Sequence, residues 1–174
     1  GWVALTAGLA GGAHAVLIPE IDFDVQRVVD TIHHRHGRGA SYSVVVVAEG
    51  AKPAGGALTV EVAGDVTRQE KLGGIGQKLT EMIAARCDYE VRTTVLGHVQ
   101  RGAAPCAFDR ELATRFGVKA VDLIAEGSFG HITAMVHGHI VGRPMQTAVG
   151  SLKLVDPAGE LVRTARAVGI EVGA

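Results

Sequence analysis

Residues 44–50 read Val-Val-Val-Val-Ala-Glu-Gly, and the part from Val44 to Ala48 is the longest uninterrupted apolar run in the chain. A run this short suits a buried strand and falls far below the roughly 18 residues that a membrane-spanning helix needs. Because apolar and polar residues do not alternate in it, we expect a strand covered on both faces, as in a parallel sheet. The polar pair Glu49-Gly50 marks its carboxyl end.

Helical apolar spacing surrounds this strand on both sides. Asp24 is placed to cap a helix from Val25 to about His36, and Gly37 and Gly39 are placed to end it. We expect further helices at residues 2–10, 76–86, 109–126 and 145–152 and after Asp156, and further strands at 15–18, 90–96 and 132–136. Residues 52–69 read as a surface loop or a small hairpin, and the end of the chain as a loose tail. Strands alternating with helices predict an α/β fold with right-handed crossovers.

Charge and composition exclude several classes of partner. The chain has 174 residues, 17 basic and 18 acidic side chains and a net charge of −1, which provides no global field for nucleic acid or an anionic membrane. Aromatic residues make up 4%, too few for a base-stacking surface.

Cys87 and Cys106 lack disulfide or metal spacing, so we expect a cytoplasmic protein. Gly1-Trp2 opens directly into a helical pattern without an initiator Met, and we expect a cut end there.

Polar side chains follow two of the expected strands, where ligands of open α/β sheets bind. Glu49 follows the first, and the second runs into His98, Gln100 and Arg101 between flanking glycines, with Arg92 near its start. An Arg fork suits a phosphate, a His can donate to a phosphate oxygen, and a carboxylate accepts bonds from sugar hydroxyls. These residues are consistent with a phosphosugar site. The alternative, polar loop residues that end strands in water, stays open from chemistry alone.

Other clusters have plainer readings. A group of His and Arg residues at the end of the 25–36 helix suits a metal or an anion, but cations at a helix C-terminus are simply favourable with the helix dipole. Three further histidines lack carboxylate or thiol neighbours at metal spacing, and Gly73–Gly76 lacks the full phosphate-loop fingerprint. These histidines and arginines are His33, His34, Arg35, His36, Arg38, His131, His137 and His139.

The segment Arg92-Thr-Thr-Val-Leu-Gly-His-Val-Gln-Arg-Gly102 resembles the most characteristic segment of 6-phosphofructokinases. The resemblance continues through Phe108-Asp-Arg110 and Leu112-Ala-Thr-Arg115, and earlier segments match in the same order at residues 1–2, 8–13, 18–20 and 45–50. It spans residues 1–156 and is closest to the actinobacterial type, whose members use ATP or pyrophosphate. It implies the C-terminal portion of a three-layer α/β sandwich with a mostly parallel sheet.

The resemblance also implies a division of the chain. Residues 1–101 are expected to form part of the fructose 6-phosphate-binding domain, 102–145 to pack with an N-terminal donor domain, and 146–174 to form a C-terminal helix and tail. Without that donor domain, the 132–136 strand would leave an unpaired edge and an apolar face. Gly102-Ala103 replaces the usual Gly-Gly, which is expected to alter that loop slightly. His14 stands where some bacterial members carry an acidic residue that helps to bind an allosteric nucleotide, and of the basic pair beside it only Arg38 is kept, with Ala40 at the other position. We therefore expect regulation by that route to be weak or absent.

Roles for single residues follow from the resemblance. Glu49 matches the carboxylate that binds sugar hydroxyls, and His98 and Arg101 match the pair that holds the 6-phosphate. Arg92 matches the arginine that reaches the 6-phosphate of a neighbouring subunit, which implies a homodimer or homotetramer. The catalytic base and the residues that bind Mg²⁺ and the donor, ATP first and pyrophosphate second, lie upstream in the family. This chain alone is therefore expected to be an inactive half-site of a glycolytic phosphotransferase.

Two other functions stay open. One is a non-catalytic phosphosugar-binding or interaction module on the same scaffold, and the other is a structural subunit whose site is lost. The presence together of Glu49, Arg92, His98 and Arg101 argues against a lost site.

Overall fold

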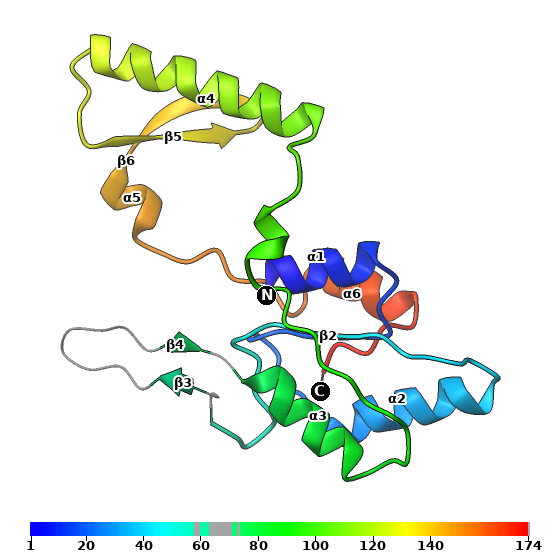
Figure 1. Ribbon diagram of the computed structural model, residues 1–174. Helices are drawn as coiled ribbons and strands as arrows, with labels where there is room; N and C mark the ends of the chain where they lie inside the picture. Colours follow the sequence, from blue (N-terminus) through cyan, green and yellow to red (C-terminus); the bar gives the residue numbers. More distant parts are fainter. Residues whose placement is uncertain (58–59, 63–70, 73, 174) are drawn as a thin grey trace. The chain divides into compact units, whose positions relative to one another are not determined.

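The computed structural model describes residues 1–57, 60–62, 71–72 and 74–173 (Figure 1). Helices and strands alternate through most of the chain, which confirms the predicted α/β class. The elements are α1 (Trp2–Ala10), β1 (Ala15–Leu17), α2 (Val25–Gly37), β2 (Val45–Val47), β3 (Val60–Val62), β4 (Lys71–Leu72), α3 (Ile75–Ala84), the 3₁₀ helix η1 (Gly97–Arg101), α4 (Ala107–Ala125), β5 (His131–Val136), β6 (His139–Pro144), α5 (Met145–Val149) and α6 (Glu160–Ala167).

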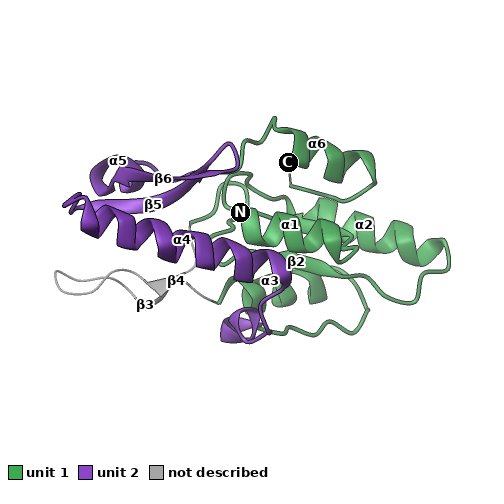
Figure 2. Ribbon diagram, turned by 90° about the horizontal axis from the view of Figure 1, so that it is seen from above, with its two compact units in different colours: residues 1–95, 154–174 green, residues 96–153 purple. Residues whose placement is uncertain are grey.

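The chain forms two compact units, which are coloured separately in Figure 2. Unit 1 contains residues 1–95 and 154–174, and unit 2 contains residues 96–153. The chain therefore leaves unit 1 once and returns to it. Each unit is described by itself below.

Unit 1 is built on a parallel pair of strands. β1 and β2 pair in register from Ala15 opposite Val45 to Leu17 opposite Val47. On the other side of β1, Glu171 forms a parallel bridge to Ala15, with its N–H donating to the carbonyl of His14 at 3.0 Å. The valine run of residues 44–48 thus lies in a parallel arrangement, as its composition predicts.

Alternate residues of the stretch formed by β1 and Ile18, which directly follows it, enter two separate apolar clusters. Val16 and Ile18 pack with α1, α6 and the C-terminal residues, whereas Ala15 and Leu17 pack with α2 and α3. This alternation follows from the two-residue period of a strand. Helices accordingly cover both faces of the parallel strands in unit 1. The residues with the largest fully buried side chains are Phe23, Leu5, Leu17, Ile18, Val16, Val28, Val29, Val162 and Val172.

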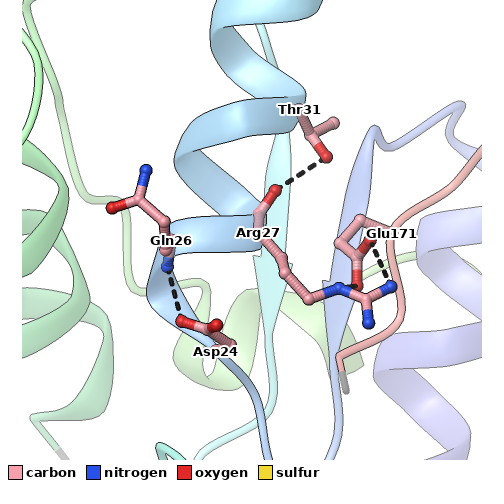
Figure 3. A network of polar contacts seen from close by, with 5 residues as sticks. All are labelled: Asp24, Gln26, Arg27, Thr31 and Glu171. Atoms are coloured by element: carbon pink, nitrogen blue, oxygen red, sulfur yellow. Dashed lines mark hydrogen bonds and ion pairs between the residues drawn. The ribbon is translucent and has the colours of Figure 1, made fainter.

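The N-terminus of α2 has the predicted cap. The carboxylate of Asp24 accepts a hydrogen bond from the backbone N–H of Gln26 at 2.8 Å (Figure 3), which satisfies one of the free N–H groups of the first turn. The helix ends at Gly37, as the glycines predict. Three buried valines on one side of α2 then fix it against the sheet: Val25, Val28 and Val29.

The prediction of a loose C-terminal tail is wrong. Ile170 and Val172 are buried, and Glu171 forms an ion pair with Arg27 of α2, with Nε–Oε1 and Nη2–Oε2 distances of 3.2 Å (Figure 3). Strand pairing with β1 and this ion pair hold the segment from both sides. A parallel pairing across so long a sequence separation leaves no local signal that a sequence pattern can reveal.

The predicted strand at residues 90–96 is also wrong, since this segment is irregular. A strand requires a partner for its ladder of hydrogen bonds, and no described strand pairs with it. Its apolar end stays outside the core, with Val95 80% exposed and Leu96 58% exposed. The sequence has the apolar content of a strand, but the partner that would order it is absent from the described residues.

Unit 2 places α4 against an antiparallel hairpin of β5 and β6. The predicted strand at 132–136 is confirmed as β5, whereas β6 was not predicted. The hairpin reverses at His137 and Gly138, whose φ angles of 50° and 81° fit the positive-φ pair of a type I′ turn. Gly142 lets Leu123 of α4 approach closely, since a Cβ there would lie 2.6 Å from the Leu123 Cδ2.

The irregular region 52–69 contains one side of a small hairpin. β3 pairs with β4 in an antiparallel sense, which supports the hairpin interpretation. Residues 58–59 and 63–69 of the region lie outside the described part of the chain, as does Gly73 of the glycine cluster. Among the residues described, no helix is both long enough and apolar enough to cross a membrane.

Candidate functional site

Glu49 lies in the turn that follows β2, at the carboxyl end of the parallel strands. The turn is fixed by hydrogen bonds from the Ala48 N–H to the Leu17 carbonyl and from the Ala51 N–H to the Ala48 carbonyl, each 2.9 Å long. The carboxylate of Glu49 is exposed, and no described side chain pairs with it. This is the position at which open α/β sheets bind ligands, and a free carboxylate there can accept hydrogen bonds from hydroxyl groups.

Arg92 lies in the irregular segment 87–95 of unit 1, with its side chain 83% exposed. Its guanidinium contacts the same oxygen of Glu90 twice, with distances to Oε1 of 2.8 Å from Nε and 2.6 Å from Nη2. Glu90 is not among the site residues predicted from the sequence. A signal for it existed, since side chains two residues apart project to the same side of extended backbone.

His98 and Arg101 both lie on η1 in unit 2, and both are exposed. Because a 3₁₀ helix has three residues per turn, side chains at i and i+3 eclipse one another. The two donors are therefore on the same side of η1. Within the described parts of the chain, neither has a hydrogen-bond or ion-pair partner.

Glycines bound η1 at both ends. Gly97 begins it with a φ of +52°, a conformation in which side-chain-bearing residues are strained, and Gly102 follows its last residue. Gln100 closes the turn by donating from its side-chain amide to the Gly97 carbonyl at 3.2 Å. Gln100 thus supports the helix, whereas its neighbours His98 and Arg101 stay open to a ligand.

The four residues predicted to bind the sugar phosphate divide equally between the units. Glu49 and Arg92 belong to unit 1, and His98 and Arg101 belong to unit 2. The pair on η1 is thus brought onto one short element by local structure. All four side chains are exposed.

The basic end of α2 lines a cavity of about 910 Å³ in unit 1. Arg27, Arg35 and Arg38 line it, together with His34 and the acidic residues Asp30 and Glu171. Arg27 is already paired with Glu171, whereas the buried Nε of Arg35 has no described hydrogen-bond partner. The basic group is evident from the sequence but the cavity is not, because Val168, Gly169 and Glu171 complete its wall from the far end of the chain.

His14 is engaged by the backbone. Its Nδ1 accepts a hydrogen bond from the Val44 N–H at 2.8 Å, which requires that nitrogen to be unprotonated. Desolvation by burial, and secondarily the positive charge of Arg35, lower the pKa of His14. Both effects favour the neutral imidazole.

No metal site is formed by the residues described, since none of their His, Cys, Asp and Glu side chains gather in groups of three or more that could hold an ion. His33 and His36 instead pack against the ring of Tyr89, with centroid distances of 5.4 and 4.5 Å. The Cys106 thiol donates to the Asp109 carboxylate at 3.1 Å at the start of α4.

Comparison with known proteins places these residues in a family context. The family model described as "Phosphofructokinase" matches residues 1–124, which include Glu49, Arg92, His98 and Arg101. The chain is 41% identical over 172 residues to ATP-dependent 6-phosphofructokinase 2 of Clostridium perfringens, covering 98% of this chain and 47% of the relative. It is 49% identical over 160 residues to the pyrophosphate–fructose 6-phosphate 1-phosphotransferase of Streptomyces coelicolor, covering 91% and 46%.

The fold is also similar to that of a solved protein. A crystal structure of Pichia pastoris phosphofructokinase in the T-state matches with a TM-score of 0.65 and 31% identity, over 86% of this chain and 16% of that one. The chain spans about half the length of the curated relatives it matches.

Proposed function

Since this chain belongs to the phosphofructokinase family, we propose that it is the C-terminal part of an actinobacterial-type 6-phosphofructokinase and supplies the fructose 6-phosphate half of the active site. The complete protein would transfer a phosphoryl group to fructose 6-phosphate and yield fructose 1,6-bisphosphate. The half-site would consist of Glu49, Arg92, His98 and Arg101.

The arrangement of η1 carries this proposal. His98 and Arg101 project from one side of a 3₁₀ helix, are exposed, and have no described partner to displace. A planar guanidinium and an imidazole donor side by side suit the oxygens of a phosphate monoester. We therefore assign them to the 6-phosphate, which anchors the sugar far from the reacting 1-hydroxyl.

The two residues of unit 1 have complementary roles in the proposal. Glu49 accepts hydrogen bonds from sugar hydroxyls, which a carboxylate does without repelling the neutral part of the ligand. Arg92 reaches the 6-phosphate of a neighbouring subunit, so that the protein acts as a homodimer or homotetramer. Residues 1–101 would belong to the sugar-phosphate domain, residues 102–145 would pack with the donor domain, and residues 146–174 would end the chain.

The phosphoryl donor and Mg²⁺ would be bound elsewhere in the complete protein. The described residues offer no metal-binding group, so no step through a metal is assigned to this chain. In-line phosphoryl transfer requires a positioned base and a clamped donor, which we place in the other half of the protein. ATP is the first candidate donor. Pyrophosphate is the second, since the Streptomyces coelicolor relative is named as a pyrophosphate-dependent enzyme, pyrophosphate–fructose 6-phosphate 1-phosphotransferase.

The test is a coupled assay for fructose 1,6-bisphosphate on the complete protein, with ATP and pyrophosphate supplied separately. Arg101→Ala and Glu49→Gln are expected to raise the KM for fructose 6-phosphate, and Arg163→Ala, which removes an exposed arginine from α6, is the matched control. Calorimetric titration of this chain alone with fructose 6-phosphate would then reveal whether the half-site binds without its partner half.

Activity with neither donor, or a KM unchanged by Arg101→Ala, would contradict the proposal. Fructose 6-phosphate binding without turnover in the complete protein would favour the alternative function, a non-catalytic phosphosugar-binding module.

A further inference from the structure

Glu90 and Arg92 form a local ion pair in the proposed half-site. Both contacts of the Arg92 guanidinium, from Nε and from Nη2, go to a single carboxylate oxygen. This is the side edge of the fork, formed by Nε and the nearer terminal nitrogen. Three of its five N–H groups, two on Nη1 and one on Nη2, remain unused by Glu90. Glu90 thus fixes the plane of the guanidinium and leaves its outer edge available for an anion.

The backbone on both sides of Arg92 is anchored to the core of unit 1. Val91 is half-buried and packs against the cluster that contains α2 and α3. The Thr93 hydroxyl contacts that of Thr80 on α3, and its Cγ2 would lie 3.1 Å from a Cβ at Gly76. With both neighbours held against the core, the side chain of Arg92 projects outward, and Glu90 is the one side chain of the described residues that restrains it.

We infer that Glu90 is a positioning residue that orients Arg92 for the substrate phosphate. This inference rests on the proposed function. An arginine side chain loses rotamer freedom when it binds a ligand, and a guanidinium that is already held loses less. Glu90 is expected to aid binding by that preorganisation.

A carboxylate so close to a phosphate site also repels the ligand. Two features limit that repulsion. The pair is largely exposed, with Glu90 74% and Arg92 83% accessible, so that water and salt screen its charge. In addition, the carboxylate lies on the side edge of the fork and the phosphate would occupy the outer edge. Orientation is therefore expected to outweigh repulsion.

Two substitutions separate geometry from charge. Glu90→Gln keeps an oxygen that accepts from Nε and Nη2 and removes the charge, whereas Glu90→Ala removes both. In the complete protein, Glu90→Ala is expected to raise the KM for fructose 6-phosphate about two- to fivefold, the range that an exposed ion pair supports. The kcat should change little, and Glu90→Gln should restore the KM of the unsubstituted protein. Glu81→Ala, which removes an exposed carboxylate from α3, is the control.

A double-substitution cycle with Arg92→Ala completes the test. If Glu90 acts through Arg92, then Glu90→Ala has no further effect once Arg92 is absent. A KM lowered by both Glu90 substitutions would identify Glu90 as a competitor of the phosphate and overturn the inference. If Glu90→Ala leaves the KM unchanged while Arg92→Ala raises it, the inference about Glu90 is overturned and the proposed function of Arg92 stands. Loss of the proposed function itself would appear differently, as an unsubstituted protein inactive on fructose 6-phosphate.

Discussion

Replacing Gly97 by alanine tests whether the shape of η1 matters for phosphate binding. Gly97 begins the 3₁₀ helix with a φ of +52°, and a Cβ built there meets no atom within 4 Å. The cost of Gly97→Ala is therefore conformational and not steric. A left-handed conformation costs a residue with a Cβ about 1–2 kcal/mol. That strain disfavours the backbone geometry that eclipses His98 and Arg101 without removing either side chain.

The size of the effect follows if ligand binding must restore that geometry. The strain then appears in the KM for fructose 6-phosphate as a rise of about five- to thirtyfold, at about 1.4 kcal/mol for each factor of ten. The kcat should fall much less, because the anchor lies away from the reacting hydroxyl. The assay is initial-rate kinetics of the complete protein over a range of fructose 6-phosphate concentrations.

A matched glycine provides the control. Gly117 lies within α4, has an ordinary φ, and also offers open space to a Cβ. Gly117→Ala should therefore stabilise the helix by about 0.5–1 kcal/mol and leave the KM unchanged. A KM for Gly97→Ala within twofold of the unsubstituted value would refute the reasoning, since η1 would then hold no geometry that the phosphate needs.

Three further outcomes are expected. Arg101→Ala should raise the KM for fructose 6-phosphate about tenfold to a hundredfold, the range for loss of a charged hydrogen bond. The KM of Arg101→Lys should lie between those of Arg101→Ala and the unsubstituted protein, since lysine keeps the charge without the planar fork. Equal KM values for the two variants would contradict a bidentate role. Because the pKa of His14 is lowered in the folded protein, the unfolded chain binds the proton more readily. The melting temperature should therefore be highest above about pH 6.5 and fall as the pH drops below that value. His14→Gln should flatten this profile between about pH 5.5 and 7.5, and an unchanged profile would mean that another group causes it. Phe23→Ala should lower the free energy of unfolding by about 3–5 kcal/mol in urea denaturation followed by circular dichroism, because the Phe23 side chain is fully buried; a loss below 1 kcal/mol would place it outside the core.

Local signals in the sequence predicted much of unit 1. The Asp24 cap, the helix end at Gly37 and the parallel strand at Val45–Val47 each depend on neighbouring residues, and each was found. The segment at 90–96, the strand β6 and the ordered C-terminal residues were not predicted. For the segment at 90–96 and the C-terminal residues, the outcome depends on whether a distant segment pairs with them, and that information is not local. The strand β6 differs, since its partner β5 lies directly before it across a two-residue turn.

The candidate site divides in the same way. The types of residue suited to a phosphosugar were evident from the chemistry of Glu49, Arg92, His98 and Arg101, but not their arrangement. Glycines on both sides of residues 98–101 indicated a loop, and the i, i+3 alignment on η1 became visible only in the structure. Glu90 was not among the predicted site residues, and its contacts with one edge of the Arg92 guanidinium became visible only in the structure.

The discontinuity of unit 1 sets an order of events during synthesis. Residues 96–153 emerge from the ribosome before residues 154–173, so all of unit 2 is made while the sheet of unit 1 still lacks the segment that pairs with β1. Val16 and Ile18 face a cluster that Val162, Ala165, Ile170 and Val172 complete only then. Until that moment α1 alone covers this face and the face is partly exposed. In that interval chaperones can capture the chain and aggregation competes with folding. Slow translation across unit 2 would lengthen that vulnerable interval without changing the final structure.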